Sequence, residues 1–193
     1  LADQGLYIAS ESSFYRVLRA AGQLARRGQA RAPTRQRPAP LQATAPNQLW
    51  SWDITYLANT LKGSFFYLYL IMDVFSRKIV GWEVFEQESA AHAAAVFTAA
   101  HRREGVPRHA WVLHADNGSP MKGATMLATR QRLGVVPSFS RPRVSNDNAY
   151  AEALFRTAKY CPLWPERPFE TIEQAREWVL RFAAWYNEEE HRH

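Results

Sequence analysis

The sequence predicts an α/β fold in which helices flank a mixed five-stranded sheet. Three segments with strand character follow one another between residues 49 and 85, joined only by short turns, and from there to residue 139 helical and strand-like segments alternate. Short turns join antiparallel strands, whereas strands separated by helices run parallel, so the sheet should contain both pairings. A length of 193 residues with a 47% apolar share is enough for one sizeable core.

The first three strands are marked by aromatic and β-branched residues. Residues 50–57, WSWDITYL, alternate in polarity, and residues 65–73, FFYLYLIMD, form the nearly continuous apolar run that is typical of a central strand. Lys62 and Gly63 provide the turn between them. The third strand, IVGWEVF at residues 79–85, completes an antiparallel meander.

The following part of the chain is expected to alternate helices with two short strands. Ser89 is a suitable N-cap for an alanine-rich helix that ends before Gly105 and Pro107. The helices are expected at residues 89–103, 123–133, 148–159 and 171–187, and the strands at 111–114 and 135–139. The prolines of CPLWP at residues 161–165 separate the last two helices, because proline disrupts a helix interior.

The N-terminal residues 1–30 are predicted to hold one short helix. Ser10 and Ser12 are candidate N-caps, apolar residues follow at helical spacing from Phe14, and Arg-Arg-Gly at residues 26–28 would end the helix. Two interpretations remain open. The segment is either the end of a DNA-binding helix-turn-helix region or a helix that packs on the main domain.

Residues 31–46 are predicted to be an extended linker, because they contain four prolines and three arginines and little that could join a core. The main domain is expected at residues 47–193. The chain begins at Leu1 and stops at His193, directly after a predicted helix, so we expect it to be truncated, including at its C-terminus.

The net charge of +6 is concentrated near the N-terminus. Residues 1–50 hold seven arginines and two acids, and the rest of the chain is nearly balanced. This distribution favours a polyanionic partner, although a solubilising tail gives the same pattern. The single cysteine, Cys161, excludes an intramolecular disulfide and a thiolate zinc site. Without an apolar run of about 18 residues there is no membrane partner to expect, and the cytoplasm is the expected compartment.

Three acidic residues occupy positions that folding alone does not require. Asp53 lies inside an apolar strand, where an uncompensated charge is costly. Asp116 directly follows the fourth strand, at the edge where α/β sheets bind ligands, although Asp-Asn-Gly is also a common turn sequence. Glu152 lies on a helix among alanines, where a merely solvated role is the alternative.

Together, carboxylates from two strand ends and one helix suit a hard divalent cation. Mg²⁺ prefers oxygen ligands and is often held by few protein ligands together with phosphate oxygens. Two such ions about 3.5–4 Å apart would support an in-line phosphoryl displacement. The absence of a His/Cys cluster argues against zinc, and His114 is expected to be a structural neighbour of the site.

The pattern of these acids resembles the Asp-Asp-35-Glu pattern of bacterial insertion-sequence transposases and retroviral integrases. Thirty-five residues separate Asp116 from Glu152, and Lys159 follows seven residues after the glutamate. Four ordered motifs are similar to the transposases: NQLWSWDITY at 47–56, MDVFSRKIVGW at 72–82, HADNGSPMKG at 114–123 and SNDNAYAE at 145–152. Ala115 departs from this pattern, since many relatives have serine there.

The resemblance implies a ribonuclease H-like fold and a function. Asp53, Asp116 and Glu152 would be the catalytic residues and would hold two Mg²⁺ ions, with Mn²⁺ as a substitute. The enzyme would free a 3′-hydroxyl at the end of an insertion sequence and join it to target DNA. It would act as a homo-oligomer on the nucleoid, with no small-molecule substrate. Two alternatives stay open: a silent DNA-binding remnant, and a nuclease of the same fold that only hydrolyses.

The DNA contacts are expected around the three acids, because basic and amide side chains there can bind phosphates without reading sequence. The residues expected to make them are Lys159, Arg156, Arg141, Arg143, Lys122 and Asn117. The segment from Ser140 to Asn148 has few apolar residues, so we expect it to move. In this hypothesis DNA contact helps to seat Glu152 on the metal, while Asp53 and Asp116 form the fixed half of the site.

Overall fold

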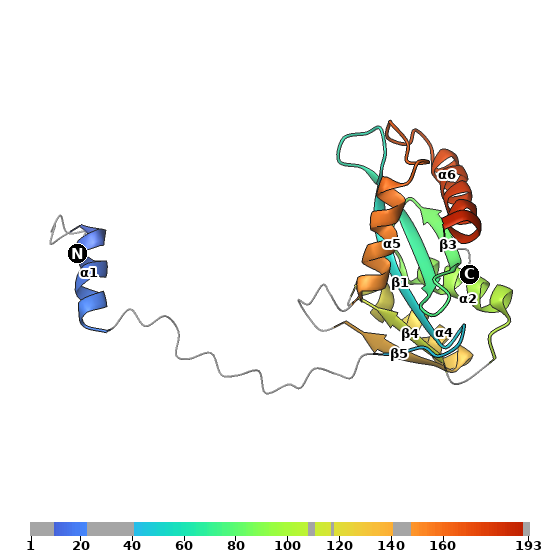
Figure 1. Cartoon of the computed structure of the whole chain (residues 1–193), viewed down its shortest axis with the longest axis horizontal. Coiled ribbons are helices and arrows are strands. Elements are labelled where there is room, and N and C mark those ends of the chain that lie inside the picture. Colours follow the sequence, from blue (N-terminus) through green and yellow to red (C-terminus); the bar gives the residue numbers. More distant parts are fainter. Residues whose placement is uncertain (1–9, 23–40, 108–110, 117, 141–147, 191–193) are drawn as a thin grey trace. The chain divides into compact units, whose positions relative to one another are not determined.

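The computed structural model describes residues 10–22, 41–107, 111–116, 118–140 and 148–190. Contacts within the chain divide it into two compact units, Leu1–Pro40 and Leu41–His193 (Figure 1). The second unit therefore begins inside the stretch that was expected to be a linker. There the side chain of Gln48 accepts hydrogen bonds from the backbone of Thr44 and Ala45, which forms a local turn.

In the first unit the described structure is a single helix, α1 (Glu11–Ala20), with Ser10 at its N-cap position as predicted. The helix ends earlier than expected. Gly22 adopts a left-handed conformation with φ 66°, and its N–H donates to the carbonyl of Arg19, which closes the last turn. The expected stop at residues 26–28 and most of the predicted linker lie outside the described residues.

The second unit is built on the predicted mixed five-stranded sheet, with strand order β3-β2-β1-β4-β5. Its strands are β1 (Leu49–Ala58), β2 (Phe65–Asp73), β3 (Ile79–Phe85), β4 (Trp111–Ala115) and β5 (Val135–Phe139). The first three pair antiparallel, and β4 and β5 extend the sheet in parallel from β1. The prediction of a meander followed by parallel strands is confirmed.

Helices cover both faces of the sheet (Figure 1). One apolar cluster joins the sheet to α2 (Ala90–Glu104), α3 (Ser119–Lys122) and α4 (Ala124–Leu133). A second cluster joins the opposite face to α5 (Ala149–Tyr160) and α6 (Ile172–Trp185). Because β2 contributes to both clusters, its nearly continuous apolar sequence is explained.

The limits of α2 follow the predicted signals. The Ser89 hydroxyl accepts a hydrogen bond from the N–H of His92 at the start, and Gly105 ends the helix in the left-handed conformation. The helix lies very close to β3 at Gly81, where an added Cβ would come 2.8 Å from the Cβ of Ala100. A side chain at this position would push the helix and strand apart.

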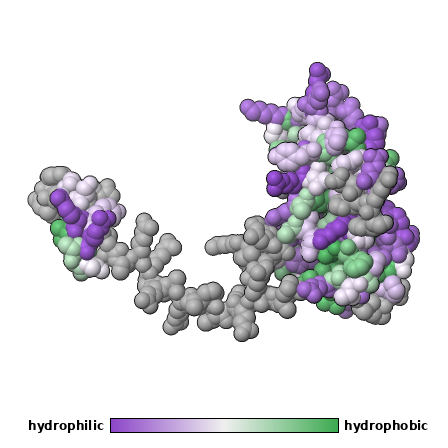
Figure 2. All heavy atoms as spheres, viewed as in Figure 1, coloured by the Kyte–Doolittle hydropathy of each residue, from purple (hydrophilic) through white to green (hydrophobic). Residues whose placement is uncertain are grey.

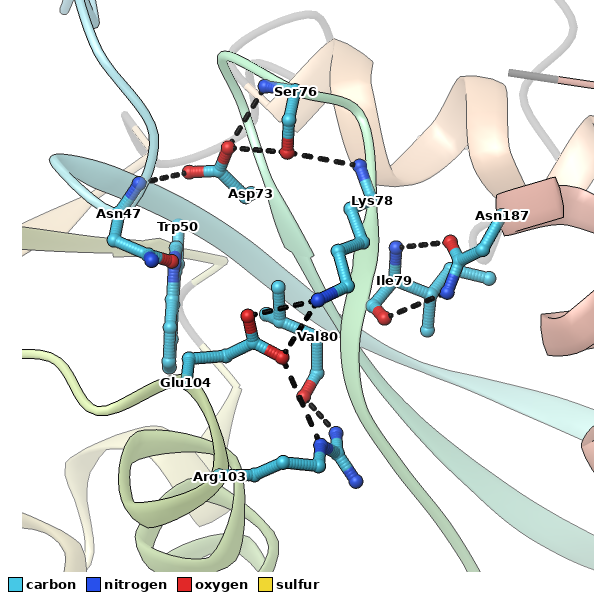
Figure 3. A network of polar contacts seen from close by, with 10 residues as sticks. All are labelled: Asn47, Trp50, Asp73, Ser76, Lys78, Ile79, Val80, Arg103, Glu104 and Asn187. Carbon is cyan, nitrogen blue, oxygen red and sulfur yellow. Dashed lines mark hydrogen bonds and ion pairs between the residues drawn. The ribbon is translucent and has the colours of Figure 1, made fainter. Parts of the chain in front are cut away.

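Two helical regions differ from the prediction. The turn expected after Asp116 continues into α3, because Pro120 presets the backbone of a first helical turn. The last helix was expected to run to residue 187, but α6 ends at Trp185 and a π-helical turn, η3 (Tyr186–Glu190), follows. In that turn Asn187 both donates to and accepts from the backbone of Ile79, which fastens the end of the chain to strand β3 (Figure 3).

The turn between β2 and β3 is organised around a buried acid, Asp73, which is 1% exposed (Figure 3). Its carboxylate accepts hydrogen bonds from the N–H of Asn47 at 2.8 Å and from both the N–H and the hydroxyl of Ser76 at 2.8 and 2.6 Å. Nearby, Lys78 forms an ion pair with Glu104 at 3.0 Å, which joins the same turn to the end of α2.

The surface is mixed in polarity (Figure 2). In this view hydrophilic residues cover the end of the second unit that carries α6, and hydrophobic residues gather near β5 and α4, where Val136 and Leu127 are exposed. Within the described parts of the chain, none of the helices has the length and apolar character that crossing a membrane requires.

Candidate active site

Asp53 lies at the point where β1 loses its parallel neighbour. The ladder between β1 and β4 runs only to the pair Trp52–Ala115, although β1 itself continues to Ala58. Asp53 therefore lies inside its strand, as its apolar neighbours indicated, and not at a strand end. On the β4 side Asp53 has no paired strand residue, because the pairing of β4 with β1 ends at Ala115. The residue after Ala115 is Asp116, so strand register alone brings the two aspartates to the same level of the sheet.

The turn after β4 orients Asp116. Its Oδ1 accepts a hydrogen bond from the N–H of Gly118 at 2.9 Å, an Asx-turn geometry. A Cβ at Gly118 would lie 3.0 Å from this oxygen, so a larger residue would disturb the carboxylate. The glycine that the sequence suggested as a mere turn residue thus also makes room for the acid.

Glu152 reaches the same region from the first turn of α5 and is exposed. The helix packs on the sheet through Leu154 and Ala158, both 3% exposed, and Ala151 is buried as well. Glu152 lies on the helix that the sequence predicted. Its side chain is exposed, and the helix contacts strand β1.

The start of α5 is also tied to β1 by Asn148, which is 4% exposed. Its side-chain oxygen accepts a hydrogen bond from the hydroxyl of Ser51 at 2.7 Å, and its amide donates to the carbonyl of Trp52 at 3.3 Å. Both partners lie within two residues of Asp53. The start of the helix that carries Glu152 is therefore docked beside Asp53. That DNA contact helps to seat the Glu152 side chain on the metal stays a prediction. The expected movement of residues 141–147 lies outside the described residues.

The three acids influence one another electrostatically. The pKa of Asp53 is raised from 3.8 to about 7, mainly by burial and in addition by the charges of Asp116 and Glu152. The N–H of Ile54 acts in the opposite direction through a 2.8 Å hydrogen bond. The structure thus brings all three predicted acids into one electrostatic group. A cation placed among them would relieve both the burial cost and the repulsion.

These residues fit a divalent cation of the magnesium type. Among the described residues no three His, Cys, Asp or Glu side chains are arranged to hold a metal ion together. One or two protein carboxylates with phosphate oxygens are enough for Mg²⁺, however, and Asp53 and Asp116 provide two. Glu152, being exposed, has the rotamer freedom to add a third carboxylate.

A cavity of about 140 Å³ lies at the two aspartates. It is lined by Asp53, Ile54, Tyr56, Glu88, Asp116, Gly118, Pro120 and Met121. Tyr56 donates a hydrogen bond to Glu88 at 3.1 Å. No role was predicted for Tyr56, Glu88, Ser51 or the Asn148 side chain, because each acts through a contact between segments that are distant in the sequence.

Among the residues expected to contact DNA, Lys159, Arg156 and Lys122 are exposed. Lys122 lies 5.6 Å from the ring of Phe139, next to the fifth strand. Arg141, Arg143 and Asn117 lie outside the described residues. His114 bonds to the hydroxyl of Ser138 at 2.9 Å, which joins β4 to β5.

Comparisons with known proteins agree on one family. A family model described as "Integrase core domain" matches residues 43–145, and a second with the same description matches residues 133–193. The chain is 33% identical over 145 residues to the transposase for insertion sequence element IS904 of Lactococcus lactis, which covers 75% of this chain and 56% of that protein. It is 30% identical over 174 residues to a putative transposase for IS986/IS6110 of Mycobacterium tuberculosis, which covers 84% and 61%. The chain thus spans less than two thirds of these relatives.

Among solved structures, the chain is similar to the HTLV-2 integrase catalytic core in complex with magnesium, in its dimeric form. The TM-score is 0.54 at 16% identity, with 77% of this chain and 91% of the other covered. At this identity the likeness shows the fold alone, and it confirms the predicted ribonuclease H-like architecture.

Proposed function

The chain belongs to the integrase core domain family, and from this premise we propose that it is the catalytic core of an insertion-sequence transposase that cleaves and joins DNA. The reaction would free a 3′-hydroxyl by hydrolysis of one phosphodiester. That hydroxyl would then attack a phosphodiester of a second DNA at the same site. The substrates would be element ends and target duplex.

The observation that carries this proposal is the convergence of three carboxylates from separate parts of the chain. Asp53 and Asp116 are level on neighbouring parallel strands, and Glu152 is near enough for its charge to raise the pKa of Asp53. A partly buried acid with such a raised pKa, in a cavity shared with Asp116 and Glu88, is typical of a functional site. We assign all three as ligands of the metal ions.

Two divalent cations held here, Mg²⁺ with Mn²⁺ as a substitute, would activate the attacking oxygen and stabilise the leaving one. The side chains of Asp53, Asp116 and Glu152 would hold these ions, and the backbone around them orients the carboxylates. The Asx turn at Gly118 fixes one oxygen of Asp116, and the N–H of Ile54 fixes one of Asp53, so each acid keeps its other oxygen for the site. The solved integrase core named above was obtained in complex with magnesium, which supports this choice of ion.

The positively charged residues on α5 would position the DNA. Arg156 and Lys159 are exposed on the helix that carries Glu152, and Lys122 is exposed on α3 beyond Asp116. Arg141, Arg143 and Asn117 would add contacts from the neighbouring segments. Such contacts bind phosphates without reading sequence, so DNA affinity should fall steeply as salt rises.

The relatives suggest the setting of this reaction. The HTLV-2 core was solved in a dimeric form, and two DNA ends must be joined in one event, so we expect two or more copies on DNA. The names of the relatives place them on bacterial insertion sequences. We therefore expect this protein in the bacterial cytoplasm, on the nucleoid when it acts.

The test is strand cleavage by the purified chain and its Asp116→Asn variant, with a labelled duplex in Mg²⁺. Asparagine keeps an oxygen for the Gly118 N–H but loses the charge, so cleavage should fall at least about 1,000-fold. Glu152→Gln should lose activity as well. Its matched control is Glu173→Gln, since Glu173 is also exposed in the first turn of a helix.

A second substrate with a pre-cut 3′-end separates this proposal from the two alternatives. Joined product supports strand transfer, nicking without joining indicates a nuclease, and DNA binding without either indicates a silent remnant. Cleavage by Asp116→Asn at the unmodified rate would show that the assignment of the acids is wrong.

A further inference from the structure

Three aromatic residues gather at the end of the β1–β2 ladder, beyond the candidate active site. Tyr56 pairs with Tyr67 across the strands, with ring centroids 5.3 Å apart, and its ring is 5.8 Å from that of Phe65. Both contacts are edge-to-face. Tyr56 is nevertheless 57% exposed and Phe65 43% exposed, so a large part of the Tyr56 ring remains open to solvent.

The open ring is held in place on its polar side. The Tyr56 hydroxyl donates to Glu88, and Glu88 directly precedes Ser89, the N-cap of α2. This hydrogen bond raises the pKa of Tyr56, so the phenol stays neutral and does not itself repel DNA. A ring fixed by two aromatic neighbours and one carboxylate loses little entropy when a flat ligand stacks on it.

The same ring borders the candidate active site. Tyr56 and Glu88 line the cavity that contains Asp53 and Asp116. Three strand residues span about 10 Å, and neighbouring nucleotides of one strand are about 3.4 Å apart along a duplex. Residues 53 and 56 point to opposite faces of β1. Both nevertheless line this one cavity, at the part of β1 that has no β4 neighbour, so a phosphate held at Asp53 would have a nucleotide within about three positions that can reach Tyr56 around the strand edge.

We propose that Tyr56 is a stacking site for an unpaired nucleobase of the DNA substrate, next to the phosphate that reacts. This inference rests on the proposed function for the position of the DNA. The chemistry beside the ring favours a base over a phosphate, because the Glu88 carboxylate at the Tyr56 hydroxyl repels phosphate while an aromatic face accepts any base. Bases inside a duplex are stacked on one another, so the site takes a base that is unpaired at a frayed or flipped position.

The experiment measures stacking without cleavage. The protein carries Asp116→Asn throughout, and the probe is a short duplex ending in about three unpaired nucleotides, one of them the fluorescent base 2-aminopurine. Stacking on Tyr56 should quench this fluorescence. Tyr56→Ala should remove the quenching and weaken binding of this probe by roughly 5- to 150-fold, the range of base–aromatic stacking, while binding of a blunt duplex is unchanged.

Two further variants make the result specific. Tyr56→Phe keeps the ring and should keep the quenching. Phe75→Ala is the matched control, because Phe75 is also an exposed aromatic residue, 48% exposed, but does not line the cavity. It should leave both binding and quenching unchanged. Equal melting temperatures of the variants establish that each is folded.

Quenching that persists in Tyr56→Ala, or that is absent in the parent, overturns the inference. Neither result depends on catalysis, so the proposed function is judged separately by cleavage and joining with the unmodified chain. If that chain neither cuts nor joins DNA while quenching still requires Tyr56, the stacking site stands and the proposed function fails.

Discussion

Two aspartates on the paired strands β1 and β2 have opposite surroundings. Asp73, level with Trp50 in the ladder, is 1% exposed and receives three hydrogen bonds from Asn47 and Ser76. Asp53, level with Leu70, receives one from its neighbour Ile54 and faces the charges of two other acids.

The difference teaches how to separate a structural acid from a functional one. The donors around Asp73 satisfy its charge within the fold, so burial is tolerated there. At Asp53 the fold supplies repulsion instead, and its pKa rises to about 7. Such a site is relieved by a proton or by a bound cation, which is the arrangement expected of a metal-binding carboxylate.

The largest expected effect is on catalysis. Asp53→Asn should lower strand cleavage at least about 1,000-fold, because a lost metal ligand removes several kcal/mol of charge stabilisation. Asp73→Asn, compared at a temperature where both variants are folded, should stay within about tenfold of the unmodified rate, since Asp73 bonds to Asn47 and Ser76 and does not line the cavity of the candidate site. Cleavage rates in Mg²⁺ check both. Equal losses in the two variants would remove the distinction between the acids.

The second effect is a pH dependence of stability in the metal-free protein. The pKa of Asp53 is raised in the folded state from 3.8 to about 7. Between these two pH values the folded protein therefore keeps a proton on Asp53 that the unfolded chain has lost. Stability contributed by the protonated acid is therefore lost as pH rises toward 7. Between about pH 5 and 8 the loss should be up to about 3 kcal/mol, and Asp53→Asn should not show it.

Urea unfolding in EDTA at several pH values measures this difference. Subtracting the free energy of unfolding of the variant from that of the unmodified protein cancels the contribution of the other titrating groups. Added Mg²⁺ should stabilise the unmodified protein and not the variant. Parallel pH curves for the two proteins would contradict the raised pKa.

The third effect concerns the structural acid. Asp73→Ala leaves the N–H groups of Asn47 and Ser76 without their acceptor, in a turn that also carries the positive φ of Arg77, 62°. The free energy of unfolding should fall by about 2–3 kcal/mol. Asp73→Asn keeps one acceptor oxygen, so its free energy of unfolding should fall by less than that of Asp73→Ala. Urea unfolding checks the order of the two variants, and an unchanged Asp73→Ala would show that these hydrogen bonds do not stabilise the turn.

The sequence predicted the mixed sheet and singled out Asp53, Asp116 and Glu152, whose catalytic role stays a prediction, but it did not show what distinguishes Asp53 from Asp73. Both acids belong to apolar strands, and the donors of Asp73 come partly from Asn47, far away in the sequence. The local signals that worked, Ser89 and Gly105 around α2, act within one turn of helix. The side-chain contacts of Tyr56 and Asn148 join segments that only the folded chain brings together.

The smallest expected effect concerns Ser51, which lies two residues before Asp53 and fastens the start of α5. Ser51→Ala removes the donor to Asn148 and leaves a buried oxygen without it, while the bond from Asn148 to Trp52 remains. The free energy of unfolding should fall by about 1 kcal/mol. Thr157→Ala is the control on the same helix, because its hydroxyl bond to Ala153 is exposed and its loss should change stability by less than about 0.5 kcal/mol. If the docking of α5 by this pair also sets Glu152 beside Asp53, Ser51→Ala should need a higher Mg²⁺ concentration for half-maximal cleavage, and Thr157→Ala should not. An unchanged Mg²⁺ requirement would show that Asn148 stabilises the helix without positioning Glu152, and that Glu152 owes its place to the packing of Leu154 and Ala158 on the sheet.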